Sequence, residues 1–199
     1  MVLIDTMKNV SEKAVRTSKI TAYDVVYTAM AVTLISVCSW ITIPMTVPFT
    51  MQTFGVFVSV ALFGLYRGTA AVLIYLALGA LGAPIFSGFN SGIGYLLGNT
   101  GGYLIGFLFA AIVSGLIIKL FGQKPYIMFL GMAAGLIVCY AFGTLYFIYV
   151  YTKNAGSVGL LTVLTWCVFP FIIPDILKII LAAFIAKRFS KYVKGVKSL

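Results

Sequence analysis

The sequence predicts an all-α integral membrane protein with six transmembrane helices, both termini in the cytoplasm, and outer loops that close a ligand pocket. Of its 199 residues, 62% are hydrophobic and only 9% are charged, a balance that excludes a water-soluble domain. Crossings of about 20 residues each allow six spans and leave no room for a second domain. Most of the basic residues cluster at the two ends of the chain. We therefore expect residues 1–199 to form a single membrane domain.

The predicted spans are apolar runs separated by basic turns or by segments rich in Gly, Pro, Asn and Thr. They cover residues 25–43, 51–66, 68–86, 103–120, 126–151 and 160–186. Residues 1–24 place apolar side chains on one helical face, which predicts a cytoplasmic segment with a short interfacial helix. Residues 187–199 form a basic cytoplasmic tail. The second span is short for a crossing, so the loop before it is expected to dip into the membrane, where irregular backbone must line a cavity.

The distribution of basic residues predicts the orientation. Lys153 is the one basic residue on the predicted outer side, and Lys178 lies within the membrane. Such an imbalance is a strong positive-inside signal, and basic ends also suit contact with the anionic lipid of the bilayer. The loops 44–53, 87–102 and 152–159 therefore face outward. The cytoplasmic side receives twelve basic residues: Lys8, Lys13, Arg16, Lys19, Arg67, Lys119, Lys124, Lys187, Arg188, Lys191, Lys194 and Lys197.

Two charged residues of the last span, Asp175 and Lys178, are the strongest candidates for a functional site. Counted from the basic tail at about 1.5 Å per residue, they lie roughly 18 Å and 13 Å inside a core about 30 Å thick. Ionisable residues at that depth usually mark function, and the i,i+3 spacing places both on one helix face. The alternative is a structural pair that only neutralises itself. Pro174 favours a site, because a proline inside the run is expected to open the helix there.

Four uncharged residues near the outer loops are further candidates for contact with a ligand. Gln52 begins the second span, where an amide at membrane depth needs a partner. Asn90 lies in the charge-free loop 87–102, where an amide either lines a site or stabilises a turn. Phe86 and Tyr95 belong to a group of outer aromatic residues, most of which serve as interfacial or packing residues while one or two stack on ligand.

The sequence lacks residues and motifs that several functional classes require. It contains no histidine, which excludes Ser-His-Asp triads and HExxH zinc sites, and its three cysteines lie singly in apolar runs without metal-site spacing. No GxxxxGK[ST] phosphate loop is present, so the chain is not expected to hydrolyse ATP. We expect no enzyme activity, no cofactor, no metal and no nucleic-acid partner. A channel would need polar rings through the whole membrane, whereas the polar residues gather in the outer half.

Three blocks of sequence resemble the BioY family, the biotin-specific substrate-binding (S) components of energy-coupling-factor (ECF) vitamin transporters of the bacterial cytoplasmic membrane. The blocks are Val-Pro-Phe-Thr-Met-Gln-Thr at 47–53, a glycine-rich stretch at 75–107 with Thr-Gly-Gly-Tyr-Leu at 100–104, and the segment 170–178. Asn99 and Pro174 depart from the usual family residues, proline and glycine respectively. The resemblance implies high-affinity capture of biotin from outside the cell.

The resemblance also implies partners and roles. The partners are a membrane-embedded coupling subunit and two cytoplasmic ATPase subunits, and small residues on the first span, among them Ala29 and Thr33, offer a narrow face for such contact. Lys178 suits the biotin carboxylate and Asp175 the ureido N–H groups, with Asn90 and Gln52 on the remaining polar atoms. The swapped arrangement, with Lys178 on the ureido carbonyl, stays open. So do a self-sufficient small-molecule carrier and an S component for another carboxylate-bearing vitamin.

Overall fold

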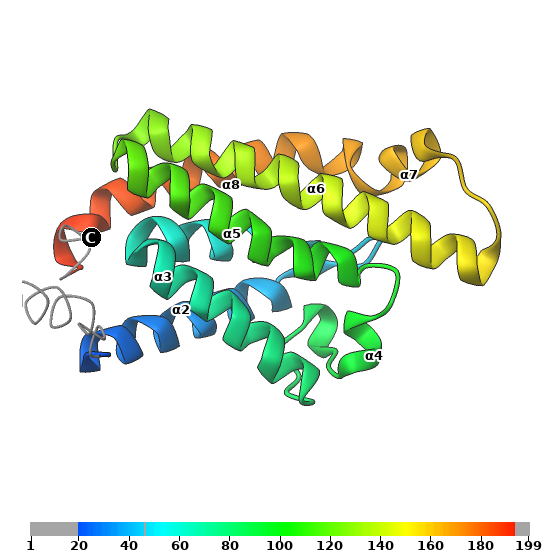
Figure 1. Cartoon of the computed structure of the whole chain (residues 1–199), viewed down its shortest axis with the longest axis horizontal. Helices are drawn as coiled ribbons and strands as arrows, with labels where there is room; N and C mark the ends of the chain where they lie inside the picture. The colour runs from blue at the N-terminus through cyan, green and yellow to red at the C-terminus, as the bar shows by residue number, and fades with distance from the viewer. Residues whose placement is uncertain (1–19, 46, 194–199) are drawn as a thin grey trace, which may run out of the picture.

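The computed structural model describes residues 20–45 and 47–193, and it is helical apart from one short hairpin (Figure 1). The expected interfacial helix in residues 1–24 lies almost wholly outside the described residues, as does the end of the basic tail. The main helices and the two strands are α2 (Ala22–Trp40), β1 (Thr42–Ile43), β2 (Phe49–Thr50), α3 (Gln52–Ala80), α4 (Ile93–Leu96), α5 (Gly101–Phe121), α6 (Pro125–Ala155), α7 (Leu160–Cys167) and α8 (Phe169–Phe189).

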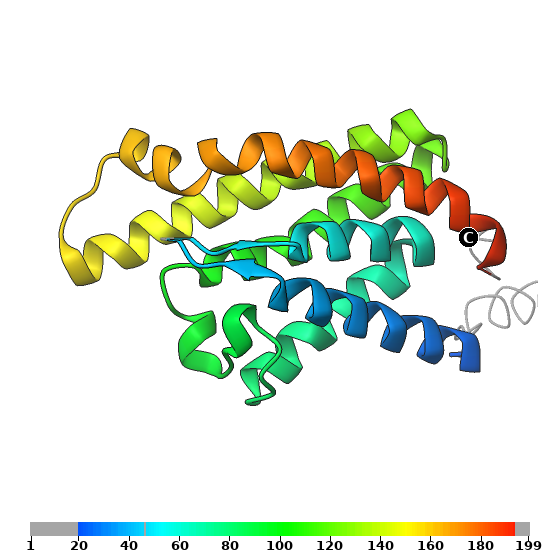
Figure 2. The ribbon, with the colours of Figure 1, turned by 180° about the vertical axis from the view of Figure 1, so that it is seen from behind.

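The long helices run side by side between two ends of an elongated bundle (Figures 1 and 2). The start of α2 and the end of α8 lie at the same end of the bundle, because the chain runs along its length an even number of times. The β-hairpin, α4 and the α6–α7 connection lie at the opposite end. Within residues 20–45 and 47–193, five helices are long and apolar enough to cross a membrane: α2, α3, α5, α6 and α8, the last extended to Tyr192. The placement of both termini in the cytoplasm remains a prediction.

The predicted second and third spans are a single element, α3, bent back on itself at Gly64. This glycine has φ 86° and ψ 173°, a conformation that is costly for any other residue. The sequence predicts the turn at Arg67, three residues later, because a charge is a more visible signal than a glycine inside an apolar run. Residues 52–63, before the bend, extend about 18 Å at 1.5 Å per residue. This part is too short to cross a bilayer core of about 30 Å, which agrees with the expectation that the second span is short for a crossing.

The predicted sixth span is divided into α7 and α8, and the break differs in place from the prediction. Val168 has φ −127° and ψ −57° and separates the two helices, while Pro174 lies inside α8. Pro170 accounts for the break: it has no N–H to donate to a carbonyl of the preceding turn, and its fixed φ suits the first turn of α8. The expectation that Pro174 opens the helix was wrong.

The outer loops are more ordered than the sequence predicts. Residues 42–43 and 49–50 pair as an antiparallel hairpin, Thr42 with Thr50 and Ile43 with Phe49. The third predicted span ends early, at Ala80, and the chain then turns at Gly82, whose φ is +106°. The side chain of Phe86 folds back onto Gly79, where a Cβ atom would lie 2.1 Å from the ring. The loop is therefore built around the contact between this ring and a glycine.

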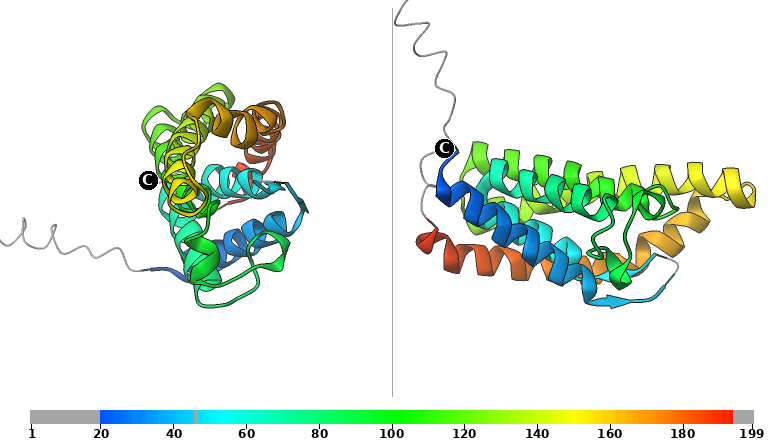
Figure 3. Two further views of the ribbon diagram at one scale, coloured as in Figure 1. Left: turned by 90° about the vertical axis from the view of Figure 1, so that its right-hand side faces the viewer. Right: turned by 90° about the horizontal axis from the view of Figure 1, so that it is seen from below.

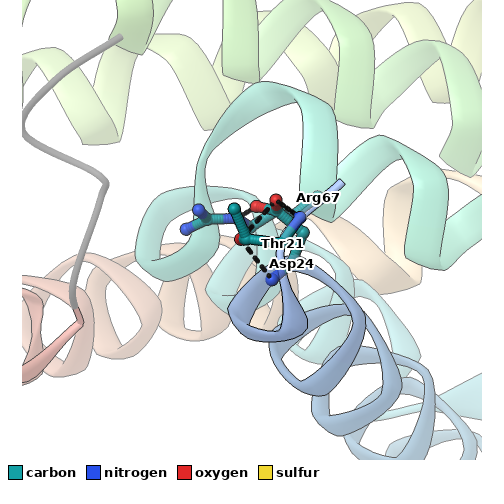
Figure 4. A network of polar contacts seen from close by, with 3 residues as sticks. All are labelled: Thr21, Asp24 and Arg67. Carbon is teal, nitrogen blue, oxygen red and sulfur yellow. Dashed lines mark hydrogen bonds and ion pairs between the residues drawn. The ribbon is translucent and has the colours of Figure 1, made fainter. Parts of the chain in front are cut away.

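A polar network at the other end of the bundle joins α2 to α3 (Figure 4). Thr21 and Asp24 form a capping box at the start of α2, and Arg67 Nε donates to Asp24 Oδ1 at 2.6 Å. The guanidinium also lies 5.3 Å from the ring centre of Tyr27. Because the Asp24 side chain is 31% exposed, solvent screens this ion pair and it adds little to stability. It sets the register of α2 against the second half of α3.

Viewed along its length, the bundle has α3 at its centre, between α2 and the layer formed by α5, α6 and α8 (Figure 3). Buried residues of α3 dominate the main core, including Phe57, Val72 and the fully buried Tyr75. A smaller core of residues from the hairpin, α5, α6, α7 and α8 lies nearer the hairpin end. The candidate site lies where these two cores meet.

Candidate ligand-binding pocket

A pocket opens between the hairpin, α3, α5, α6 and α8, with an empty volume of about 610 Å³, part of it continuous with solvent. Its wall is mostly apolar, with a few polar groups. The lining residues are Val47, Pro48, Thr50, Gln52, Thr53, Ser87, Tyr95, Thr100, Tyr103, Leu104, Phe107, Leu136, Cys139, Tyr140, Cys167, Phe171, Asp175 and Lys178.

The two predicted charged residues meet in this pocket. Lys178 Nζ donates to Asp175 Oδ1 at 2.7 Å, and both side chains are nearly inaccessible, at 6% and 5% exposure. Tyr140 on α6 donates its hydroxyl to Asp175 Oδ2 at 2.5 Å. An ionised carboxylate accepts about four hydrogen bonds. Two are supplied by the protein, which leaves about two for a ligand.

Lys178 has a larger share of its hydrogen-bonding capacity already used within the protein than Asp175 has. Its ammonium group also donates to the backbone carbonyl of Thr50 at 2.7 Å and lies 4.1 Å from the ring centre of Phe49. Two of its three N–H donors therefore already have partners within the protein. Since the Asp175 carboxylate neutralises its charge at contact distance, the pair presents no net positive charge to the pocket.

Gln52 supplies a donor without a partner. It is 2% exposed and lines the pocket, and its Nε2 is buried and unbonded among the described residues. A buried amide without a partner costs about 1–3 kcal/mol. Its place at the start of α3, directly after β2, turns this group toward the same space as the charge pair. A ligand carbonyl would satisfy it.

A second polar group of the pocket consists of hydroxyls from the α4 side. Ser87 and Tyr95 are hydrogen-bonded to each other at 3.0 Å, and Thr100 lies at the start of α5. All three line the pocket. They belong to α4 and to the segments on either side of it, and α4 lies across the hairpin from α8 (Figure 2). The pocket therefore has a charged end and a hydroxyl end joined by apolar wall.

Two predicted site residues lie outside the pocket lining. Phe86 is fully buried and packs against Tyr75 and Tyr95, with ring centres 5.5 Å apart in both pairs. It supports Tyr95 from behind. Asn90 is exposed, and its side-chain Nδ2 donates to the backbone carbonyl of Ser87 at 2.8 Å. Its backbone carbonyl accepts from Phe86 N. Its observed contacts are those of a turn residue, the alternative that the sequence left open.

Sequence reasoning missed Tyr140 and Ser87. Tyr140 lies in the middle of a long apolar helix, where the sequence suggests only packing. A phenol at membrane depth still needs a hydrogen-bond partner, and that requirement is the signal that could have identified it. Ser87 lies in a loop rich in serine and glycine, and nothing in the sequence separates it from its neighbours. The contact from Lys178 to Thr50 joins residues 128 positions apart and involves a backbone oxygen, so no residue pattern in the sequence predicts it.

The predicted partner face on α2 is solvent-accessible in the isolated chain. Ala29 and Thr33 are both exposed, and the Thr33 hydroxyl bonds back to the Ala29 carbonyl at 3.0 Å. Their larger neighbours Val26, Met30 and Val37 are exposed as well. The face is thus free to meet either lipid or another helix.

Comparisons with known proteins agree on one family. The sequence profile of the BioY family matches residues 10–195. The chain is 41% identical to the biotin transporter BioY of Thermotoga maritima, over 79% of this chain and 90% of that protein. It is 38% identical to the biotin transporter BioY of Rhodobacter capsulatus, over 73% and 80% of the two chains.

A solved structure supports the same assignment. The fold resembles the 2.1 Å crystal structure of the S-component for biotin from an ECF-type ABC transporter, with a TM-score of 0.77 and 27% identity. The match covers 88% of this chain and 94% of that one. Together with the profile and the transporter sequences, it shows that this chain belongs to the BioY family.

Proposed function

We propose that this chain is the biotin-binding S component of an ECF-type importer and that biotin binds in the pocket beside Asp175. The observation that carries the proposal is the set of polar groups at the charged end. Asp175 has acceptor capacity for about two further hydrogen bonds, and Gln52 Nε2 is a buried donor without a partner among the described residues. The ureido group of biotin has two N–H donors and one carbonyl, which complements this set.

Only one end of biotin fits at the charge pair. Lys178 Nζ and Asp175 Oδ1 are 2.7 Å apart, whereas the ureido and carboxylate groups of biotin are separated by the thiolane ring and a four-methylene chain. The two residues therefore cannot each hold a different end of the ligand. A ligand carboxylate here would be repelled by Asp175 as strongly as it is attracted by Lys178. The neutral ureido group avoids that conflict, which favours the arrangement with Lys178 on the carbonyl side.

The biotin carboxylate then points toward the hydroxyl end. Ser87, Tyr95 and Thr100 present hydroxyl groups able to donate to an anion, and this end of the pocket is the side toward α4. Apolar side chains, including Leu104 and Phe107, cover the rings and the methylene chain between the two ends. In this arrangement the carboxylate stays nearer water, which lowers the cost of desolvating it.

Transport is driven by other chains in this proposal. The chain has no phosphate loop, so a membrane-embedded coupling subunit and two cytoplasmic ATPases supply the energy. We place the termini in the cytoplasm and the pocket toward the outside, as the basic residues predict. The exposed face of α2 around Ala29 and Thr33 is the contact for the coupling subunit, because small residues allow close helix approach.

The test is titration of the purified full-length chain with biotin in detergent, by isothermal calorimetry. We expect saturable binding at a stoichiometry near one, unchanged by ATP and Mg²⁺. A biotin amide that lacks the negative charge should lose affinity, and the Lys178→Met variant should lose the same factor on going from biotin to the amide. Binding of other carboxylate-bearing vitamins but not of biotin would refute the assigned ligand. A biotin amide penalty that disappears in Lys178→Met would place the carboxylate on the lysine instead.

A further inference from the structure

The side chain of Lys178 joins α8 to the segment that covers the pocket. We call residues 47–51 the lid segment, since Val47, Pro48 and Thr50 form one wall of the cavity. Lys178 donates to the Thr50 carbonyl at 2.7 Å, and its ammonium group lies 4.1 Å from the ring centre of Phe49. A single charged group thus makes two contacts with the lid segment.

The lid segment has little support of its own. Each strand of the hairpin is two residues long, and an isolated two-stranded hairpin is marginally stable at best in water. Gln52 N donates to Thr50 Oγ1 and Gly55 N to the Met51 carbonyl, both at the start of α3, and the other attachments of the lid segment to the helices are apolar. Val47 is buried in the smaller core, and the ring of Phe49 lies 6.1 Å from that of Phe171. The lysine provides the one polar bond between this segment and α8 among the described residues.

The lysine is itself held in place from behind. Asp175 accepts from Lys178, and Tyr140 donates to the other oxygen of the same carboxylate. A continuous series of hydrogen bonds therefore runs from α6 through α8 to the backbone of Thr50. All of these side chains are largely buried. Hydrogen bonds in the protein interior are stronger than those at an exposed surface.

We propose that Lys178 is a positioning residue for the lid segment, and that it holds residues 47–51 over the pocket in the absence of ligand. The charge pair then has two roles, since Asp175 faces the ligand while Lys178 closes the wall beside it. Calling the cavity a ligand pocket rests on the function proposed above. Closure of the pocket by Lys178 does not depend on that function, because the closure is a property of the ligand-free chain.

The native cysteines report on this closure without any introduced label. Cys139 and Cys167 are buried and line the pocket beneath the lid segment. Cys38 is also buried but lies at the contact between α2 and α3. A Cβ atom added to Gly55 of α3 would be 3.1 Å from the Cβ atom of Cys38. Opening of the lid segment exposes the first two thiols alone, whereas general loosening of the bundle exposes all three.

The experiment measures alkylation of each cysteine by N-ethylmaleimide in the purified, ligand-free full-length chain, followed by peptide mass spectrometry. Lys178→Met removes the contact with the lid segment. The double variant Asp175→Asn, Lys178→Met removes it without leaving a buried carboxylate unpaired. Lys153→Met is the matched control, because this lysine also lies over an aromatic ring, Tyr149 at 4.3 Å, but is on the α6 end away from the pocket lining.

We expect Cys167 and Cys139 to react at least tenfold faster in the double variant than in the natural chain, with Cys38 unchanged. Lys178→Met should show the same pattern, and Lys153→Met should match the natural chain at all three cysteines. Unchanged rates at Cys167 and Cys139 in the double variant would show that apolar packing alone holds the lid segment. Equal acceleration of all three cysteines in the double variant would also overturn the proposal, since the lysine would then stabilise the whole bundle. Neither result depends on whether biotin is the ligand.

Discussion

Replacing Asp175 by Asn gives the sharpest test of the proposed ligand contact. The substitution keeps the shape of the side chain but removes its charge and replaces one acceptor oxygen by an amide NH₂. Two of its hydrogen bonds are made with Lys178 and Tyr140, and the remaining capacity faces the pocket. Hydrogen bonds to a charged group contribute about 1.5–3 kcal/mol. At about 1.4 kcal/mol per factor of ten, biotin affinity should fall by roughly 10- to 150-fold.

The assay must separate loss of a ligand contact from loss of a structural partner. We would measure the biotin dissociation constant by calorimetry for Asp175→Asn, for Lys178→Met and for the double variant. If Asp175 touches the ligand, its replacement should weaken binding in the Lys178→Met background as well. The thermal midpoint of each ligand-free variant serves as the stability control. Equal affinities of Lys178→Met and the double variant, or unchanged affinity in both single variants, would refute the contact and support a purely structural pair.

Three further predictions use other parts of the chain. Gln52→Leu should weaken biotin binding by about five- to thirtyfold, because a bond worth about 1–2 kcal/mol is lost. It should also raise the thermal midpoint of the ligand-free chain, and lower stability with unchanged affinity would contradict this. In intact cells, a cysteine replacing Ser91 should react with impermeant thiol reagents and one replacing Gln123 should not, and the reverse pattern would invert the topology. Ala29→Leu should reduce ATP-driven biotin uptake in liposomes that contain the coupling subunit and ATPases, with biotin affinity retained, while Met30→Leu serves as the control. Equal uptake by both variants would remove the α2 face from the partner contact.

Local composition was enough to predict much of the helical architecture. The apolar runs are long, and backbone in a bilayer must satisfy its own hydrogen bonds, so each run had to be helical. The predicted fourth span, residues 103–120, differs from α5 (Gly101–Phe121) by two residues at one end and one at the other. The pairing of Asp175 with Lys178 also followed from spacing, because residues three apart share a helix face whatever surrounds them.

Breaks inside apolar runs were harder to predict, since several residues compete to make them. Gly64, rather than Arg67, reverses α3, and Pro170, rather than Pro174, accounts for the division between α7 and α8. Each choice depends on which turn allows neighbouring helices to pack. The hairpin formed by residues 42–43 and 49–50 is similar: two residues per strand carry too little signal, and the hairpin exists because the rest of the molecule supports it.

The site itself depended on contacts between distant segments. Charge and depth identified Asp175 and Lys178, and an amide at membrane depth identified Gln52, because such groups are costly wherever they are buried. Tyr140 and the carbonyl of Thr50 complete the network from other elements, and only the packing of α6 and the hairpin against α8 brings them there. The same packing places Phe86 behind Tyr95 instead of in the pocket. Sequence determined which polar groups needed partners, and tertiary structure decided which partners they found, because partner choice is set by distances between segments that local composition does not contain.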